Sequence, residues 1–274
     1  MLVSKLIYHV PMTDLANLAT TETGISIART IQIISQIGIF ILPPIVLAFL
    51  ISDNPSRYLG FEKKPAIKIL TISILIMFTT LPLIHQMASW NEAIKLPAFL
   101  EGIEKWMLEK EQQSEEISKK FLEVSSISGL LLNLLMIGIL PAVGEELLFR
   151  SVLQPMIGKT LKNMHLGIII SAILFSMMHL QFYGFIPRVA LGMLLGYFYL
   201  WSGSILVPML MHLVNNGSAV ILFYVANNGY ADINAEEFGS TSNSIILIIS
   251  IFISVGLCYF AHRANEKIKP LENG

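Results

Sequence analysis

Long apolar runs separated by short polar connections dominate the chain. Uncharged or nearly uncharged stretches, most of them about the 20 residues that a helix needs to cross a bilayer, recur along it. Gly203 and Pro208 interrupt what would otherwise be one overlong run near residue 205. The pattern predicts an all-α, polytopic membrane helix bundle with about seven to eight transmembrane helices. The seven stretches lie at roughly 30–50, 66–89, 124–143, 164–180, 187–201, 204–225 and 244–262.

One connection, residues 90–123, has a different pattern. Its apolar residues recur at intervals of three and four, which places them on one stripe of a helix and leaves an acidic face for water. The pattern predicts an extra amphipathic helix, either docked on the bundle or lying on the membrane surface. The apolar positions are Leu96, Phe99, Leu100, Ile103, Trp106 and Met107.

Composition agrees with this pattern and narrows the class of protein. Of the 274 residues, 54% are hydrophobic and 14% charged, and the mean hydropathy is +0.67. A soluble domain carries about 25% charged residues, so this composition is typical of a polytopic membrane protein. The net charge of −1 excludes a general affinity for nucleic acid, so we expect membrane lipid and no nucleic acid among the partners. A single cysteine, Cys258, excludes an intramolecular disulfide.

Lysine and arginine positions predict the orientation in the membrane. The connection 226–243 contains neither residue, whereas three other connections are basic. These groups alternate consistently if the N-terminus lies outside and the C-terminus in the cytoplasm. The first residues, MLVSKLIYHVPMTD, lack the apolar core and cleavage site of a signal peptide. The basic groups are Arg57, Lys63 and Lys64, then Lys159 and Lys162, then Arg263, Lys267 and Lys269.

The run 124–143 ends in the charged sequence PAVGEELLFR. Ionisable side chains near a bilayer core cost at least ~2.5–3.5 kcal/mol each, so they usually have a function. On a helix Glu146 and Arg150 are four residues apart and suited to an ion pair. Glu145 points about 100° away and lacks that partner. We therefore expect the two carboxylates to have different roles, with Glu145 available for chemistry.

Two further polar groups interrupt later spans. His179 follows Phe175 by one helical turn, and His212 shares a helix face with Asn216. At ~1.5 Å of rise per residue, Glu145, His179 and Asn216 lie ~21, ~22 and ~18 Å from one membrane face, and His212 only ~12 Å. The groups can thus converge on one buried site if residues 145–158 form a helix antiparallel to 164–180. We expect Pro141 to mark a break or kink where that helix begins.

These groups favour hydrolysis of an amide bond without a covalent intermediate. A carboxylate and a histidine can hold and deprotonate a water, and a second histidine with an asparagine amide can donate hydrogen bonds to the oxyanion. No G-x-S-x-G supports a serine nucleophile, and no H-E-x-x-H marks a zinc site. Zinc is the alternative, with Glu145, His179 and His212 as its ligands. We favour metal-free activation of water.

At these residues the sequence resembles the CPBP family of intramembrane proteases, which includes CaaX prenyl proteases and bacteriocin-processing proteins. The family motifs E-E-x-x-x-R, F-x-x-x-H and H-x-x-x-N match at Glu145–Glu146–Arg150, Phe175–His179 and His212–Asn216. The resemblance covers about residues 125–220. It implies that Glu145 activates water with His179, that His212 and Asn216 surround the oxyanion, and that Glu146 and Arg150 form a supporting pair.

The resemblance implies an intramembrane endopeptidase, CaaX-protease-like, acting on a peptide or membrane-protein substrate in a bacterial cell membrane. Two alternatives are a catalytically silent immunity or scaffold protein, and a proton-coupled transporter. We expect one integral domain in three parts. These are an N-terminal region with two spans and the amphipathic helix (1–123), a CPBP-type catalytic core (124–225), and a loop, last span and tail (226–274).

Overall fold

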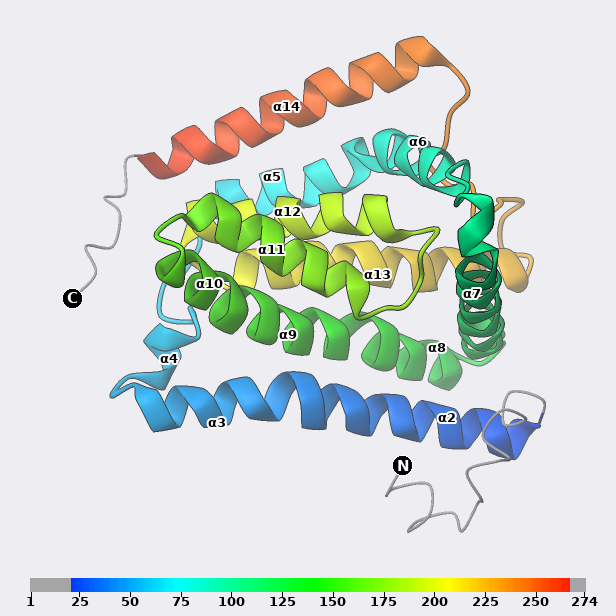
Figure 1. Cartoon of the computed structure of the whole chain (residues 1–274), viewed down its shortest axis with the longest axis horizontal. Helices are drawn as coiled ribbons and strands as arrows, with labels where there is room; N and C mark the ends of the chain where they lie inside the picture. Colours follow the sequence, from blue (N-terminus) through cyan, green and yellow to red (C-terminus); the bar gives the residue numbers. More distant parts are fainter. Residues whose placement is uncertain (1–20, 267–274) are drawn as a thin grey trace.

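The computed structural model describes residues 21–266, which form helices and connecting loops with no strand among them. This confirms the predicted all-α fold. Most helices run side by side along one axis (Figure 1). The α-helices are α2 (Glu22–Ser35), α3 (Leu42–Ile51), α4 (Pro55–Tyr58), α5 (Ile67–Thr79), α6 (Leu81–Glu92), α7 (Glu101–Leu122), α8 (Ile127–Asn133), α9 (Leu140–Glu146), α10 (Gln154–Thr160), α11 (Met164–Met177), α12 (Phe185–Ser202), α13 (Leu206–Asn227) and α14 (Ser244–Glu266).

Four shorter segments have other helical geometries. One is a 3₁₀ turn, η3 (Ala98–Leu100). The other three are π-helical: η2 (Gln36–Ile41), η4 (Leu134–Ile139) and η5 (Leu147–Leu153). Each π segment continues directly from one α-helix into the next. Isolated π turns inside α-helices are rare and occur frequently at functional sites.

Fewer helices than predicted have the length and composition of a membrane span. Among the described residues five qualify, and the pair α5–α6, bent by 44°, makes a sixth. Every predicted stretch corresponds to a helical segment, but α11 has only 14 residues, or ~21 Å, against a hydrocarbon core of ~30 Å. The five are Glu22–Ile51, Ile127–Thr160, Phe185–Ser202, Leu206–Asn227 and Ser244–Ala264.

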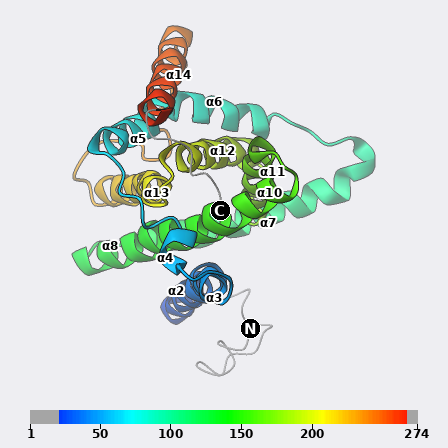
Figure 2. The same ribbon diagram turned by 90° about the vertical axis from the view of Figure 1, so that its left-hand side faces the viewer.

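The bundle has a middle layer and two outer helices. Figure 2, which looks along the bundle, places α2 and α3 on one outer side and α14 on the other. Between them lie the continuous helix from α8 to α10 and the helices α11, α12 and α13. One buried apolar cluster joins α5, α12, α13 and α14 through Ile76, Leu195, Phe198, Met211 and Ala261. This cluster packs the middle layer against α5 and α14, and a second one that includes Ala48 and Leu147 packs it against α3.

Of the break or kink predicted at Pro141, a break does not occur. Residues Ile127–Thr160 form one helix of 34 residues, ~51 Å long, that runs through the proline. The π turn η4 directly precedes the α-segment in which Pro141 takes an early position, where a missing N–H is tolerated. As predicted, residues 145–158 are helical and pack against α11.

The hairpin of α10 and α11 depends on two glycines. A Cβ atom at Gly167 would lie 2.6 Å from the Gln154 carbonyl oxygen and 2.8 Å from Gly158 Cα. Backbone atoms cannot move aside as the end of a flexible side chain can, so only glycine permits this approach. The close packing fixes the position of α11 beside the helix that carries Glu145 and Glu146.

The amphipathic helix is present as α7, and it lies across the end of the bundle (Figures 1 and 2). It docks on the loop between α11 and α12. Trp106 packs against Phe182 at 5.4 Å between ring centroids, and Gln181 Nε2 donates to Ser114 Oγ at 3.0 Å. The predicted stripe is only partly covered, since Phe99 is 84% exposed. The α-helix begins at Glu101, whereas the predicted apolar stripe begins at Leu96.

The basic connections lie at one end of the bundle. These are α4, the α10–α11 turn and the C-terminal end of α14, whereas the connection 226–243 lies at the opposite end (Figure 1). This arrangement agrees with the predicted orientation, in which the basic segments lie on one side of the membrane and the connection 226–243 on the other. The side that faces the cytoplasm stays a prediction. The interpretation of the N-terminal residues and of Lys267 and Lys269 falls outside the described residues.

Candidate active site

Glu146 is the centre of a fully buried ionic group. Its Oε1 lies 2.7 Å from His212 Nδ1, and its Oε2 lies 3.0 Å from Arg150 Nε. The Arg150 contact lacks hydrogen-bond alignment and therefore acts through charge. Arg150 also donates from Nη2 to the Gly192 carbonyl at 3.2 Å, and its guanidinium lies 4.8 Å from the Phe175 ring centroid. The predicted Glu146–Arg150 ion pair is confirmed.

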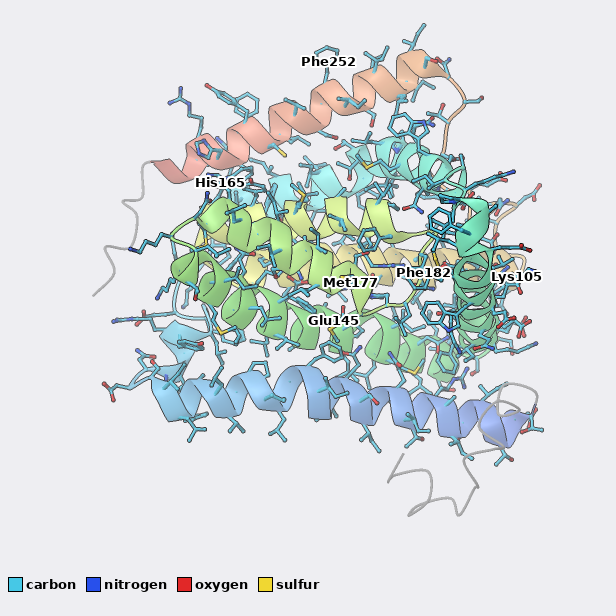
Figure 3. The ribbon with its side chains drawn as sticks, viewed as in Figure 1. Lys105, Glu145, His165, Met177, Phe182 and Phe252 are labelled. Atoms are coloured by element: carbon cyan, nitrogen blue, oxygen red, sulfur yellow. The ribbon has the colours of Figure 1, made fainter. Side chains whose placement is uncertain are left out.

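Glu145 has a different environment, as its position on the helix predicts. Its Oε1 accepts a hydrogen bond from Gln36 Nε2 at 3.0 Å. Its Oε2 is buried, receives no hydrogen bond from the protein, and lies 3.9 Å from His212 Nε2. Figure 3 places Glu145 about midway along the bundle. One carboxylate is thus engaged on both oxygens, whereas the other keeps one oxygen free.

His212 lies between the two carboxylates. Its Nδ1 contacts Glu146 Oε1 and its Nε2 faces Glu145 Oε2. Because an ionised carboxylate only accepts, Nδ1 carries a proton in this contact. The depth estimate had placed His212 shallower than Glu145, but packing of α13 against α9 brings the two together. A histidine held in one tautomer by a carboxylate is a common arrangement in catalytic sites.

His179 does not lie on a helix, contrary to the sequence interpretation. Helix α11 ends at Met177, and His179 lies in the turn that follows. It still contacts Phe175: its Nδ1 donates to the Phe175 carbonyl at 2.9 Å, and the rings are 5.0 Å apart. The same Phe175 ring lies 6.0 Å from His212. Phe175 therefore joins the two histidines, and a neutral His179 presents the lone pair of Nε2.

The backbone after His179 is strained. Leu180 has φ 52°, in the left-handed region that branched apolar residues rarely adopt. Such conformations cost roughly 1–3 kcal/mol and persist only where surrounding contacts impose them. Here the contacts between α7 and the loop provide that constraint through Phe182 and Gln181. These contacts therefore hold the strained turn that carries His179.

Asn216 makes its hydrogen bonds to residues outside the set of candidate site residues. Its Nδ2 donates to the Ile137 carbonyl at 3.0 Å, and its Oδ1 accepts from Asn215 Nδ2 at 3.0 Å. Ile137 precedes Pro141 by four residues, so its carbonyl lacks the α-helical partner that any other residue at 141 would supply. Asn216 fills this gap across the two helices. No hydrogen bond joins it to the other five candidates within residues 21–266.

The candidate zinc ligands do not fit a metal site. Within the described part of the chain no group of three His, Cys, Asp or Glu side chains has an arrangement that could hold a metal ion. Two atoms of the predicted trio already have protein partners, since Glu145 Oε1 binds Gln36 and His212 Nδ1 binds Glu146. We therefore derive no chemical step through a metal.

An apolar cavity of about 680 Å³ lies next to the turn that carries His179. Its walls come from the end of α11, the following loop, α7 and the connection before α7. Figure 3 shows Met177 and Phe182, two of its lining residues, between Glu145 and α7. A cavity of this size and character suits an apolar peptide segment.

The fold and site define a helical membrane protein with a buried glutamate–histidine centre, and comparisons with known proteins agree. Residues 127–218 match the family described as Type II CAAX prenyl endopeptidase Rce1-like, and all six candidate residues lie within them. This match to one segment of the chain bears out the resemblance found in the sequence. The chain is also 30% identical over 117 residues to the uncharacterized protein YpbD of Bacillus subtilis (strain 168). The match covers 41% of this chain and 55% of that relative. No solved structure matches significantly.

The sequence interpretation did not identify Gln36, which lies outside the matched segment. The signal was present: it is one of two amides, with Gln32, in the long uncharged run that begins after Arg29. Gln36 is only 4% exposed. Sequence alone did not show which helix this side chain faces.

Proposed function

We propose that the protein is an intramembrane endopeptidase of the CaaX-protease type, in which Glu145 activates the water that attacks a peptide bond. The observation that carries the proposal is the asymmetry of the two adjacent carboxylates. Glu146 is committed to His212 and Arg150, whereas Glu145 Oε2 is buried with no protein donor. An acceptor of this kind suits the O–H of a nucleophilic water.

The proposed reaction follows from these contacts. Glu145 Oε2 accepts a proton from water as the water oxygen bonds to the peptide carbonyl carbon. His179 Nε2, on the ring whose Nδ1 is held by Phe175, accepts the second hydrogen bond of that water and orients it. Glu145 then delivers its proton to the amide nitrogen as the carbon–nitrogen bond breaks. This releases two peptides with a new carboxyl group and a new amine.

His212 and Glu146 support the oxyanion in this proposal. When the His212 ring is doubly protonated its Nε2–H is a donor beside Glu145, and Glu146 and Arg150 balance the charge. Removing one such donor typically costs ~10²–10³ in turnover. The oxyanion role of Asn216 stays a prediction, because the hydrogen bond that its Nδ2 makes in this structure goes to the Ile137 carbonyl and not to the other candidates.

The membrane and the family support a peptide substrate that is reached from the bilayer. Five helices among residues 21–266 are long and apolar enough to span a membrane, and the candidate residues lie in the family-matched segment. We propose membrane lipid as the surroundings and a peptide or membrane protein as the substrate. No contact within the described residues favours a transporter or a silent scaffold over this function.

The test is a comparison of peptides in membranes from cells that produce the wild type or the Glu145→Gln variant. New peptide termini should appear with the wild type and disappear with Glu145→Gln. The matched control is Glu237→Gln, the same chemical change at an exposed loop position, which should retain them. Identical sets of termini in all three samples would contradict the proposal.

A further inference from the structure

Gln36 belongs to the candidate site although it lies far from every motif residue in sequence. It begins η2, the π turn between α2 and α3, and its side chain is 4% exposed. Its Nε2 donates to Glu145 Oε1 at 3.0 Å across 109 positions of sequence. A glutamine in an apolar run loses its contacts with water, so this hydrogen bond must compensate. The outer helix thus contributes directly to the site.

Two local features bring Gln36 within reach of Glu145. The π turn changes the direction of the side chains in the middle of a continuous helix. Gly144, the residue before Glu145, permits close contact between α9 and η2, because a Cβ there would lie 2.9 Å from Phe40 Cβ and 3.0 Å from Ile41 Cγ1. A larger residue would push the two helices apart. The contact between Gln36 and Glu145 therefore depends on the shape of both helices.

The hydrogen bond gives the two oxygens of Glu145 different roles. Oε1 is held by a donor, so Oε2 is the oxygen directed toward His212. Gln36 Oε1 is also buried and receives no hydrogen bond from the protein. Two acceptors without a protein donor, one on Glu145 and one on Gln36, therefore belong to one bonded pair of side chains.

We propose that Gln36 is a positioning residue of the site, which holds Glu145 so that Oε2 accepts the proton of the nucleophilic water. The inference rests on the proposed function and extends the site beyond the matched segment to the outer helix. Loss of a hydrogen bond to a charged group reduces a rate by roughly 10- to 100-fold when the bond matters in the transition state. We expect that loss in kcat and not in KM, because Gln36 acts through Glu145.

The experiment compares Gln36→Met with Gln154→Met in purified, reconstituted protein acting on a peptide identified from the membrane comparison. Gln154 is the matched control: it is 2% exposed and its Nε2 donates to the Gly196 carbonyl at 3.1 Å. Both variants lose one buried hydrogen bond and keep a side chain of similar length. We expect both to lose similar stability, but only Gln36→Met to lose about 10- to 100-fold in kcat with KM unchanged.

A double variant separates positioning from general structural damage. Adding Gln36→Met to Glu145→Asp, which shortens the carboxylate but keeps it, should reduce kcat by less than the product of the two single losses, because both changes act on the position of one group. Additive losses, or equal kcat for Gln36→Met and the wild type, would contradict positioning while leaving the peptidase function standing. No turnover by the wild type would instead contradict the proposed function itself. If Gln36→Met does not fold, Gln36→Leu serves the same comparison.

Discussion

Glu146 Oε1 lies 2.7 Å from His212 Nδ1, a contact that joins the first and third motifs inside the bundle. The other oxygen of Glu146 lies 3.0 Å from Arg150 Nε, so one carboxylate holds two basic side chains. The neighbouring Glu145 shares neither contact and binds Gln36. The two adjacent glutamates therefore have different partners: Glu146 contacts two basic side chains, and Glu145 contacts an amide.

The first prediction concerns the stability that Glu146 provides. Glu146→Gln should destabilise the protein by ~3–5 kcal/mol, because it leaves the buried Arg150 without its counter-charge. Chemical unfolding in detergent, followed by circular dichroism, measures the change. Glu237→Gln, at an exposed position, should unfold like the wild type. A Glu146→Gln variant as stable as the wild type would show that the ion pair contributes nothing to the fold.

The second prediction concerns orientation. In a Cys258→Ala background, Asn234→Cys should react with a membrane-impermeant thiol reagent in intact cells, because the connection 226–243 is expected outside. Ser56→Cys, exposed at the opposite end of the bundle, should react only after lysis. The reverse pattern would invert the orientation and place the basic connections outside.

The third prediction concerns metal. Because the described side chains form no three-ligand group, turnover should survive incubation with a chelator, and purified protein should lack stoichiometric zinc. Elemental analysis and chelation kinetics measure both quantities. Stoichiometric zinc that disappears in His212→Ala would restore the alternative in which Glu145, His179 and His212 bind the ion.

The fourth prediction tests the packing that places α11. Gly167→Ala should cost about 1–3 kcal/mol, since its Cβ would lie 2.6 Å from the Gln154 carbonyl oxygen. Gly256→Ala is the control, because α14 leaves nothing within 4 Å of a Cβ there. Thermal unfolding in detergent compares the two variants. Equal melting temperatures would contradict the close hairpin.

Local periodicity predicted much of the fold and part of the site. Apolar runs identified the helical segments, and the four-residue spacing predicted the ion pair between Glu146 and Arg150, because both features depend on positions along one helix. The contact of His212 with Glu146 was not predicted, since it depends on how α13 is placed against α9. The rise per residue gives the depth of a residue along its own helix, but it does not say how far neighbouring helices are shifted along their axes relative to each other.

The remaining differences come from contacts between distant segments. Pro141 was expected to break or kink the helix, but the helix continues through it, and Asn216 from α13 donates to the Ile137 carbonyl, to which a proline at 141 cannot donate. His179 was expected on a helix, but α11 ends at Met177. Gln36 was overlooked because a polar residue in an apolar run does not reveal its partner, and Gln32 and Ser35 lie in the same run.

The central claim is that Glu145 is the base of a membrane peptidase, and turnover by Glu145→Gln tests it most directly. Purified wild-type and variant proteins in the same lipid should be compared on one peptide, with melting temperature measured on the same samples. Our account predicts that Glu145→Gln folds with nearly unchanged stability and has no measurable cleavage, while Glu237→Gln cleaves at the wild-type rate. A folded Glu145→Gln protein that retains wild-type cleavage would contradict it.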